Sequence, residues 1–299
     1  AYPIKMLTPK AQNIIADAIG DGLRLIDFPE SWLRVDGVNL IKPKKDLLER
    51  GGWRLIWMAH TWRQVGMAVI ASELERALSH VRLCYNTGWQ TFHSPAGQTR
   101  AIKHMIEIAI SNGVPIVVPL MDFSDFFNSV SHDVQEMTEG VYGVDPNVTR
   151  AHMHIYRNQT GVIEHALGEL HAKLKCTSGQ GCVAATSKCT LVLQSCEAFI
   201  GVFVPGFLLG GPPHKKVAIS LVAHADDHAG PQRDHHLGQL YVDTEWVTAF
   251  ISELVHGMGK NKSEIIIADK GVGGKYYHVD NAKFTLPSNS AGGEERIFT

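Results

Sequence analysis

The sequence predicts an α/β fold with a mainly parallel sheet and flanking helices, arranged as an open doubly wound sheet or as a barrel. Two observations support this class. Short, continuously apolar runs of strand length recur along the chain, and stretches with apolar residues three and four positions apart alternate with them. Continuous apolar strands separated by amphipathic helices are typical of parallel sheets, because helices bury both faces of such a sheet.

The first half of the sheet-forming region alternates between strand and helix patterns. Residues 51–59 predict a turn and then a strand, and residues 64–79 predict a helix from their apolar spacing. Residues 81–85 predict a strand, and residues 98–111 a helix that ends at an Asn-Gly pair, a common C-cap. The apolar run 114–120 contains two prolines, which favour an edge strand or the start of a strand.

The second half continues the alternation. Residues 160–174 predict a helix, because three leucines fall on one helical face. Residues 199–204 and 217–223 predict buried strands, residues 245–256 a helix and residues 264–268 a final strand.

The length of 299 residues suits a globular protein with one large α/β domain or two modest ones. We expect an irregular N-terminal segment at 1–50, a single α/β catalytic domain at 51–285 and a tail at 286–299. The net charge of −2 argues against a nucleic-acid partner bound through bulk charge, and no apolar run reaches the length of a membrane span. We therefore expect a cytoplasmic protein with a small-molecule substrate, leaving secretion and homo-oligomerisation open.

Histidines and aspartates are concentrated in one segment. His224, Asp226, Asp227 and His228 directly follow the apolar run 217–223. Imidazole and carboxylate groups are the usual ligands of zinc, iron and manganese. The pattern therefore predicts a metal site at the end of a buried strand.

The same residue types follow other apolar runs. His60, Asp122, His152 and Asp269 each come after one, as His224 does. Ligands of parallel α/β folds bind at the carboxyl ends of the strands, so we expect these side chains to share one edge of the sheet.

The segment His224-x-x-Asp227-His228-x-Gly230 resembles the H-x-H-x-D-H-x-G signature of the metallo-β-lactamase fold. This resemblance implies two zinc ions that activate a water for hydrolysis. The chain departs from the signature where Val222 or Ala223 replaces the first histidine, and one residue is inserted.

A second histidine pair, His152-x-His154, resembles the metal loop of the amidohydrolase barrels. The surrounding stretch 151–158 also resembles the His-x-Tyr nucleotide contact of thymidylate synthases, although that family's cysteine-containing motif is not found upstream at the expected spacing.

A glycine-rich turn follows the last predicted strand. Gly271, Gly273 and Gly274 come directly after Asp269 and Lys270. Glycines let a backbone approach a ligand closely, and exposed N–H groups can cradle an anion, so this loop is a candidate cofactor-binding site.

These patterns favour a metal-dependent enzyme, first of all a hydrolase that uses a metal-activated water. Asp226 or Asp269 would be the general base, and zinc is the expected metal, with iron or manganese as alternatives. A transferase acting on a nucleotide or phosphorylated small molecule, and a non-enzymatic metal- or ligand-binding protein, stay open. The expected metal ligands are His152, His154, His224, Asp227 and His228.

Overall fold

The structure is a computed structural model, and it describes most of the chain. The described residues are 8–42, 52–81, 86–89, 93–123, 126–177, 179, 181–210, 216–252, 264–270, 276–278, 282–286 and 294–298. They form two compact units, the first made of residues 1–81 and 127–191 and the second of residues 82–126 and 192–299. The boundaries expected at residues 50 and 285 stay predictions.

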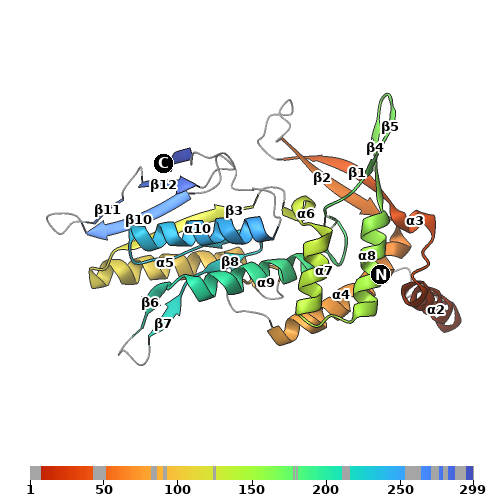
Figure 1. The fold of residues 1–299 in the computed structure, drawn as a ribbon, viewed down its shortest axis with the longest axis horizontal. Helices are drawn as coiled ribbons and strands as arrows, with labels where there is room; N and C mark the ends of the chain where they lie inside the picture. The colour runs from red at the N-terminus through yellow and green to blue at the C-terminus, as the bar shows by residue number, and fades with distance from the viewer. Residues whose placement is uncertain are drawn as a thin grey trace. The chain divides into compact units, whose positions relative to one another are not determined.

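The first unit combines a small sheet with a group of helices (Figure 1). Its sheet has the order β2-β1-β4-β5, in which β1 and β4 are parallel and the two outer pairs are antiparallel. The strands are β1 (Arg34–Ile41), β2 (Trp53–Ala59), β4 (Thr160–His165) and β5 (Gly168–Lys173), and the helices are α2 (Pro9–Leu25), α3 (Glu30–Leu33), α4 (Thr61–Val81), α7 (His132–Val141) and α8 (Pro146–Asn158).

The buried side chain of Trp57 leaves no room for a side chain at two positions of this sheet, Gly37 and Gly161. A Cβ on Gly37 would lie 2.9 Å from the indole ring, and a Cβ on Gly161 would lie 2.6 Å from it. The ring is 6% exposed, so it is buried directly against the backbone of the two neighbouring strands. Side chains at either glycine would displace it, because packed interiors leave no room of that size.

The second unit is built on a five-stranded sheet with the order β11-β10-β3-β9-β8. Every neighbouring pair in it is antiparallel. The strands are β3 (Ile116–Asp122), β8 (Val222–His224), β9 (Asp227–Ala229), β10 (Glu264–Lys270) and β11 (Tyr276–His278). Two further antiparallel pairs join β6 (Phe207–Leu209) to β7 (Val217–Ile219) and β12 (Ala282–Leu286) to β13 (Glu294–Phe298).

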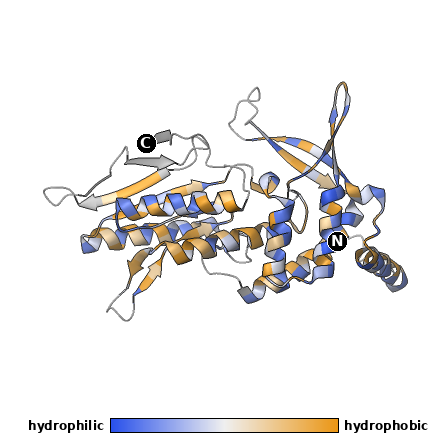
Figure 2. Ribbon diagram, viewed as in Figure 1, coloured by the Kyte–Doolittle hydropathy of each residue, from blue (hydrophilic) through white to orange (hydrophobic). Residues whose placement is uncertain are grey.

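Helices cover both faces of this sheet. Met105 and Ala109 of α5 (Pro95–Asn112) pack with Ile116 and Val118 of β3 on one face. On the other face, Val117 and Met121 pack with residues of α10 (His235–Ile251) and of α9 (Ala185–Phe203), which continues from the first unit into the second. The successive residues of β3 therefore point into two cores, and Figure 2 shows hydrophobic colouring along β10, its neighbour.

The predicted fold class is wrong, because the main sheet is antiparallel and, among the described strands, only β1 and β4 pair in parallel. The apolar runs were correctly linked to burial on both faces. Helices bury both faces of this antiparallel sheet as well, so continuous apolarity did not distinguish the two strand directions.

Several single elements are confirmed. Residues 64–79 lie within α4, residues 98–111 within α5, and residues 264–268 within β10. Gly113 caps α5 in the left-handed conformation at φ 67°, as the Asn-Gly pair predicts. Residues 53–59 form β2, whereas residues 82–85 lie outside the described part of the chain.

Other elements differ from the prediction. Residues 160–174 form the hairpin of β4 and β5 rather than a helix, and residues 199–203 are the end of α9 rather than a strand. The run 217–223 is divided between β7 and β8, and the helix predicted at 245–256 begins earlier and ends at Ile251. The proline-containing β3 is central rather than an edge strand, since it lies between β10 and β9.

None of the helices that the structure describes is long and apolar enough to cross a bilayer. Localisation in the cytoplasm stays a prediction.

A buried histidine makes the stability of the first unit depend on pH. His132 is 4% exposed, and its Nε2 donates to the carbonyl oxygen of Thr177 at 3.2 Å. Burial, and then the nearby Lys188 and Arg157 cations, lower the pKa of His132 to about 4. The folded protein therefore keeps this ring neutral at a pH where the unfolded chain already protonates it.

We predict that the free energy of unfolding falls by about 2 kcal/mol from this group between pH 7 and pH 5. The loss begins as the pH falls through the unfolded pKa near 6.5 and ends near the folded value of about 4. His132→Gln removes the titration, so its urea unfolding curves should show a smaller change over this range. An equal pH dependence in both proteins would contradict the assignment.

Candidate functional site

A short hairpin in the second unit carries two adjacent aspartates. Strands β8 and β9 pair antiparallel, with His224 opposite Asp227, and Ala225 and Asp226 form the turn between them. Ala225 has φ 58°, the left-handed conformation that tight hairpin turns require. The two aspartates therefore stand at the end of the hairpin.

The neighbouring strand supplies a third carboxylate at the same end of the sheet. Strand β9 pairs with β3 so that Asp227 lies opposite Asp122, the last residue of β3. Burial raises the pKa of Asp226, and the charges of Asp227 and Asp122 raise it further. The three carboxylates are thus close enough to repel one another, and such a group favours a bound cation.

A cavity of about 350 Å³ lies beside two of these carboxylates, Asp122 and Asp227. Asp122, Asp227 and His224 line it from the sheet, and Gln98 and Thr99 line it from the first turns of α5. The polar wall is connected, since Gln98 donates to the Thr87 hydroxyl at 2.8 Å and that hydroxyl lies 3.3 Å from Nδ1 of His224.

The turn of the hairpin is held by the segment that precedes α5. The Asn86 side chain accepts from the Ala225 N–H at 3.0 Å and donates to the Ala225 carbonyl at 2.8 Å. A Cβ on Gly88 would lie 2.0 Å from the Ala225 nitrogen, so only glycine allows this approach. Sequence patterns gave no signal for either residue, because Asn86-Thr87-Gly88 has the composition of an ordinary turn.

The residue after the second aspartate points into the core. His228 is 2% exposed, with Nδ1 2.7 Å from Glu245 of α10 and Nε2 3.7 Å from Glu197 of α9. Burial lowers the pKa of His228, but the Glu245 and Glu197 carboxylates raise it more, so the net shift is upward. This imidazole therefore anchors β9 to two helices.

The structure gathers only part of the predicted metal site. His224, Asp226, Asp227 and His228 meet in one hairpin of the second unit, as their spacing suggests. Among the residues that the structure describes, no group of three or more His, Cys, Asp and Glu side chains is arranged to enclose a metal ion.

The second histidine pair belongs to the first unit. His152 and His154 lie on helix α8, not at a strand end. Both ring nitrogens of His152 are engaged, Nδ1 with the Val148 carbonyl and Nε2 with Glu139, each at 2.9 Å. The ring of His154 lies 6.1 Å from that of Phe28. A metal-binding role for the pair stays a prediction.

The last predicted residues lie elsewhere along the sheet. Asp269 is in β10, whose register places Glu264 opposite Leu120 and Ala268 opposite Ile116. The backbone of Asp269 is therefore at the other end of the sheet from Asp122, because the two strands are antiparallel. Gly271, Gly273 and Gly274 lie outside the described residues.

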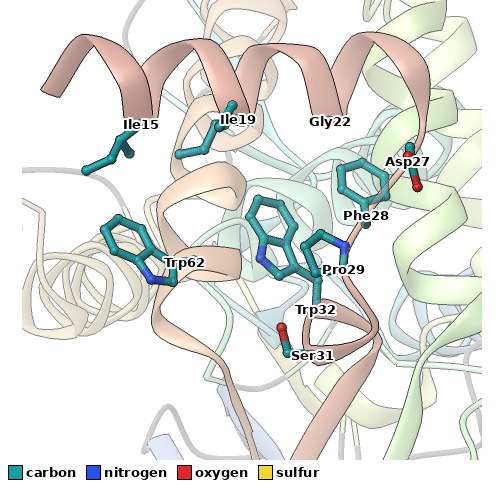
Figure 3. A pocket seen from close by; sticks show the side chains of 10 residues that line it. Ile15, Ile19, Gly22, Asp27, Phe28, Pro29, Ser31, Trp32 and Trp62 are labelled. Atoms are coloured by element: carbon teal, nitrogen blue, oxygen red, sulfur yellow. The ribbon is translucent and has the colours of Figure 1, made fainter. Parts of the chain in front are cut away.

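The first unit contains a different kind of cavity, of about 310 Å³ (Figure 3). Trp62 and Trp32 face Ile15 and Ile19 of α2 across it. Asp27 is the one ionisable side chain among its lining residues that the structure describes. Its chemistry suits packing of apolar groups rather than catalysis.

Comparison with known proteins gives a structural likeness alone. No protein-family model and no curated protein matches the sequence. The fold is similar to apo telomerase from Candida tropicalis truncated from the C-terminal domain, with a TM-score of 0.59 and 10% sequence identity. The match covers 85% of this chain and 54% of the telomerase chain, so this chain spans about half of that structure.

We predict that Gly88→Ala destabilises the second unit by about 1–3 kcal/mol, because the added methyl group must displace the Ala225 backbone. Gly97→Ala is the matched control, since a Cβ there meets nothing within 4 Å. Urea unfolding of both variants measures the difference. Equal midpoints for Gly88→Ala and wild type would show that the hairpin does not press against this segment.

Proposed function

We propose that this protein is a metal-dependent nucleic-acid polymerase, in which the terminal hydroxyl of a nucleic-acid strand loses its proton and attacks the α-phosphorus of a nucleoside triphosphate, and pyrophosphate leaves. The observation that carries the proposal is the meeting of Asp122, Asp226 and Asp227 at one end of an antiparallel sheet. The likeness of the fold to a telomerase supports it. Two-metal carboxylate sites are used by polymerases and nucleases for in-line displacement at phosphorus.

The residues present fit a hard divalent cation. Carboxylate oxygens suit magnesium and manganese, whereas zinc sites draw on imidazole and thiolate. Magnesium keeps several waters and takes one or two carboxylates together with substrate phosphates. A cage of protein ligands is therefore not required, which agrees with the open arrangement of the carboxylates beside the cavity.

Each part of the site has a separate task in this reaction. Asp122, Asp226 and Asp227 would hold the divalent ions, which supply charge neutralisation of the reacting phosphate and activation of the attacking hydroxyl. A neighbouring cation would favour the charged form of Asp226, whose pKa is raised by burial and then by the charges of Asp227 and Asp122. Gln98 and His224 provide polar groups at the cavity wall that can orient a substrate.

The proposal of a nucleic-acid partner differs from the expectation, drawn from the net charge, that the protein binds no nucleic acid. That expectation concerns binding through bulk positive charge, and the charge of −2 still argues against it. Recognition through divalent ions acts locally and does not need a basic surface. The sequence-based expectations of a small-molecule substrate and no nucleic acid stay predictions, and so does the metal-dependent hydrolase.

The finer form of the proposal concerns the template. The name telomerase denotes DNA synthesis on an RNA template, so we propose RNA-templated DNA synthesis as the first reaction to test.

We predict that purified protein extends a DNA primer on an RNA or DNA template in the presence of Mg²⁺. Asp226→Asn and Asp227→Asn should each lower the extension rate by at least about 100-fold, since loss of metal-based charge stabilisation costs several kcal/mol of transition-state energy. Gel analysis of extended primers gives the rates. The same samples, incubated with unpaired strands, report hydrolysis.

Asp234→Asn is the matched control for these variants. Asp234 caps α10 by accepting from the Leu237 N–H at 2.9 Å, and asparagine caps equally well. The control removes the same charge from the same segment and should keep wild-type rates. Absence of extension by wild type on both templates, or full activity of either aspartate variant, would refute the polymerase proposal.

A further inference from the structure

The aspartate-bearing turn cannot hold its own geometry. The hairpin strands are three residues long, and β8 lies at the edge of the described sheet. Ala225 adopts the left-handed conformation, which is strained for a residue with a side chain. Asp227 also lies opposite Asp122 in the register of β9 and β3, and like charges directly opposite one another oppose this arrangement. An external group must therefore fix the turn.

Asn86 holds the turn in place through the hydrogen bonds of its side-chain amide. Its Oδ1 accepts from the N–H groups of Ala225 at 3.0 Å and Gly88 at 2.7 Å. Its Nδ2 donates to the Ala225 carbonyl at 2.8 Å and to Oε1 of Glu197 at 2.6 Å. An amide has two donors and two acceptor sites, so these four bonds satisfy it completely.

The position of Asn86 supports the same role. The residue is 6% exposed, and its backbone forms a parallel bridge with Ala223 of β8. The Thr87 N–H donates to the Ala223 carbonyl at 3.1 Å, which extends the contact along the strand. Asn86 thus binds both the strand before the turn and the turn itself.

Glu197 links this amide to the other side of the hairpin. The carboxylate oxygen that accepts from Asn86 lies 3.7 Å from Nε2 of His228, and His228 is paired with Glu245 at 2.7 Å. The contacts run from the turn through Asn86 and Glu197 to His228 in β9. Because His228 directly follows Asp227, they brace both ends of the aspartate pair.

We propose that Asn86 is the positioning residue of the aspartate pair, and that Glu197 is its anchor. In this role Asn86 acts through the backbone of Ala225, to which its side chain is hydrogen-bonded. The inference rests on the proposed polymerase function for its catalytic consequence. The claim that Asn86 fixes the geometry in which Asp226 and Asp227 bind a divalent ion can be measured without that activity.

The first test is Asn86→Asp, which keeps the size and the acceptor oxygens but removes both donated hydrogen bonds. We expect the turnover number in primer extension to fall by about 10-fold or more while the KM for the primer–template changes less than about 3-fold, as for a loss of transition-state geometry alone. Asn13→Asp on the exposed side of α2 introduces the same charge and should match wild type.

Two further readouts do not depend on turnover. Mn²⁺ binding, followed by electron paramagnetic resonance, should weaken by about 10-fold in Asn86→Asp, because two carboxylates chelate well only in a fixed geometry. Hydrogen exchange of the peptide spanning residues 222–229 should accelerate, since the hydrogen bond that the Asn86 amide donates to the Ala225 carbonyl, and with it one of the two bonds that fix the turn, is lost.

Glu197 supplies a second pair of variants in case Asn86→Asp does not fold. Glu197→Gln keeps an oxygen that accepts from Asn86 and should retain extension and Mn²⁺ binding within about 3-fold, because the geometry of the turn is preserved. Glu197→Leu removes the acceptor and leaves one donor of the buried Asn86 amide without its partner. It should reproduce the losses predicted for Asn86→Asp.

The outcomes separate the two proposals. A wild-type protein that binds Mn²⁺ but extends no primer would refute the polymerase function and leave the Mn²⁺ and exchange comparisons to decide the role of Asn86. Wild-type Mn²⁺ affinity and exchange rates in a folded Asn86→Asp, or equal behaviour of Glu197→Gln and Glu197→Leu, would overturn the positioning role.

Discussion

The pairing of β9 with β3 is the constraint on which the candidate site depends. The register sets Asp227 opposite Asp122, and the tight turn before Asp227 then places Asp226 at the same end of the sheet. A slip of one residue would turn every side chain of β9 to the opposite face. Packing prevents this slip, because Ala229 belongs to the core beneath α5 while His228 lies buried on the other side against α9 and α10.

Burial of polar groups is the second feature of this unit. Glu197, Glu245 and His228 are each 2% exposed or less, and burying such groups is unfavourable unless they are paired. Here they pair with one another and, through Asn86, with the turn. An apolar core could fix the strands equally well, but it could not offer hydrogen-bonding groups to the Ala225 backbone. The polar network therefore explains how buried side chains of the core determine the position of the hairpin turn that carries the aspartate pair.

The sequence contained enough information to single out residues 224–228, but not the hairpin that they form or the rest of the site. His224, Asp227 and His228 stood out by residue type and by their place after an apolar run, and the structure does bring them together. Asp122 gave the same strand-end signal, yet it was not included among the expected metal ligands. The partner strand could not be identified, because strand order and direction depend on contacts between residues far apart in the chain.

Two other residues do not lie at the common sheet edge that the sequence predicted for them. Asp269 also follows apolar residues, but its strand runs antiparallel to β3, so the end that carries it is remote from Asp122. His152 has the residue type of a metal ligand, yet its ring bonds to Glu139 and to the Val148 carbonyl inside a helical core. The type of a residue determines which chemistry its side chain can perform, whereas the contacts made in the fold decide whether that side chain is available for it. For Asp226, that pairing leaves a carboxylate beside two like charges with its pKa raised, and a divalent cation is the simplest partner that would stabilise all three carboxylates together.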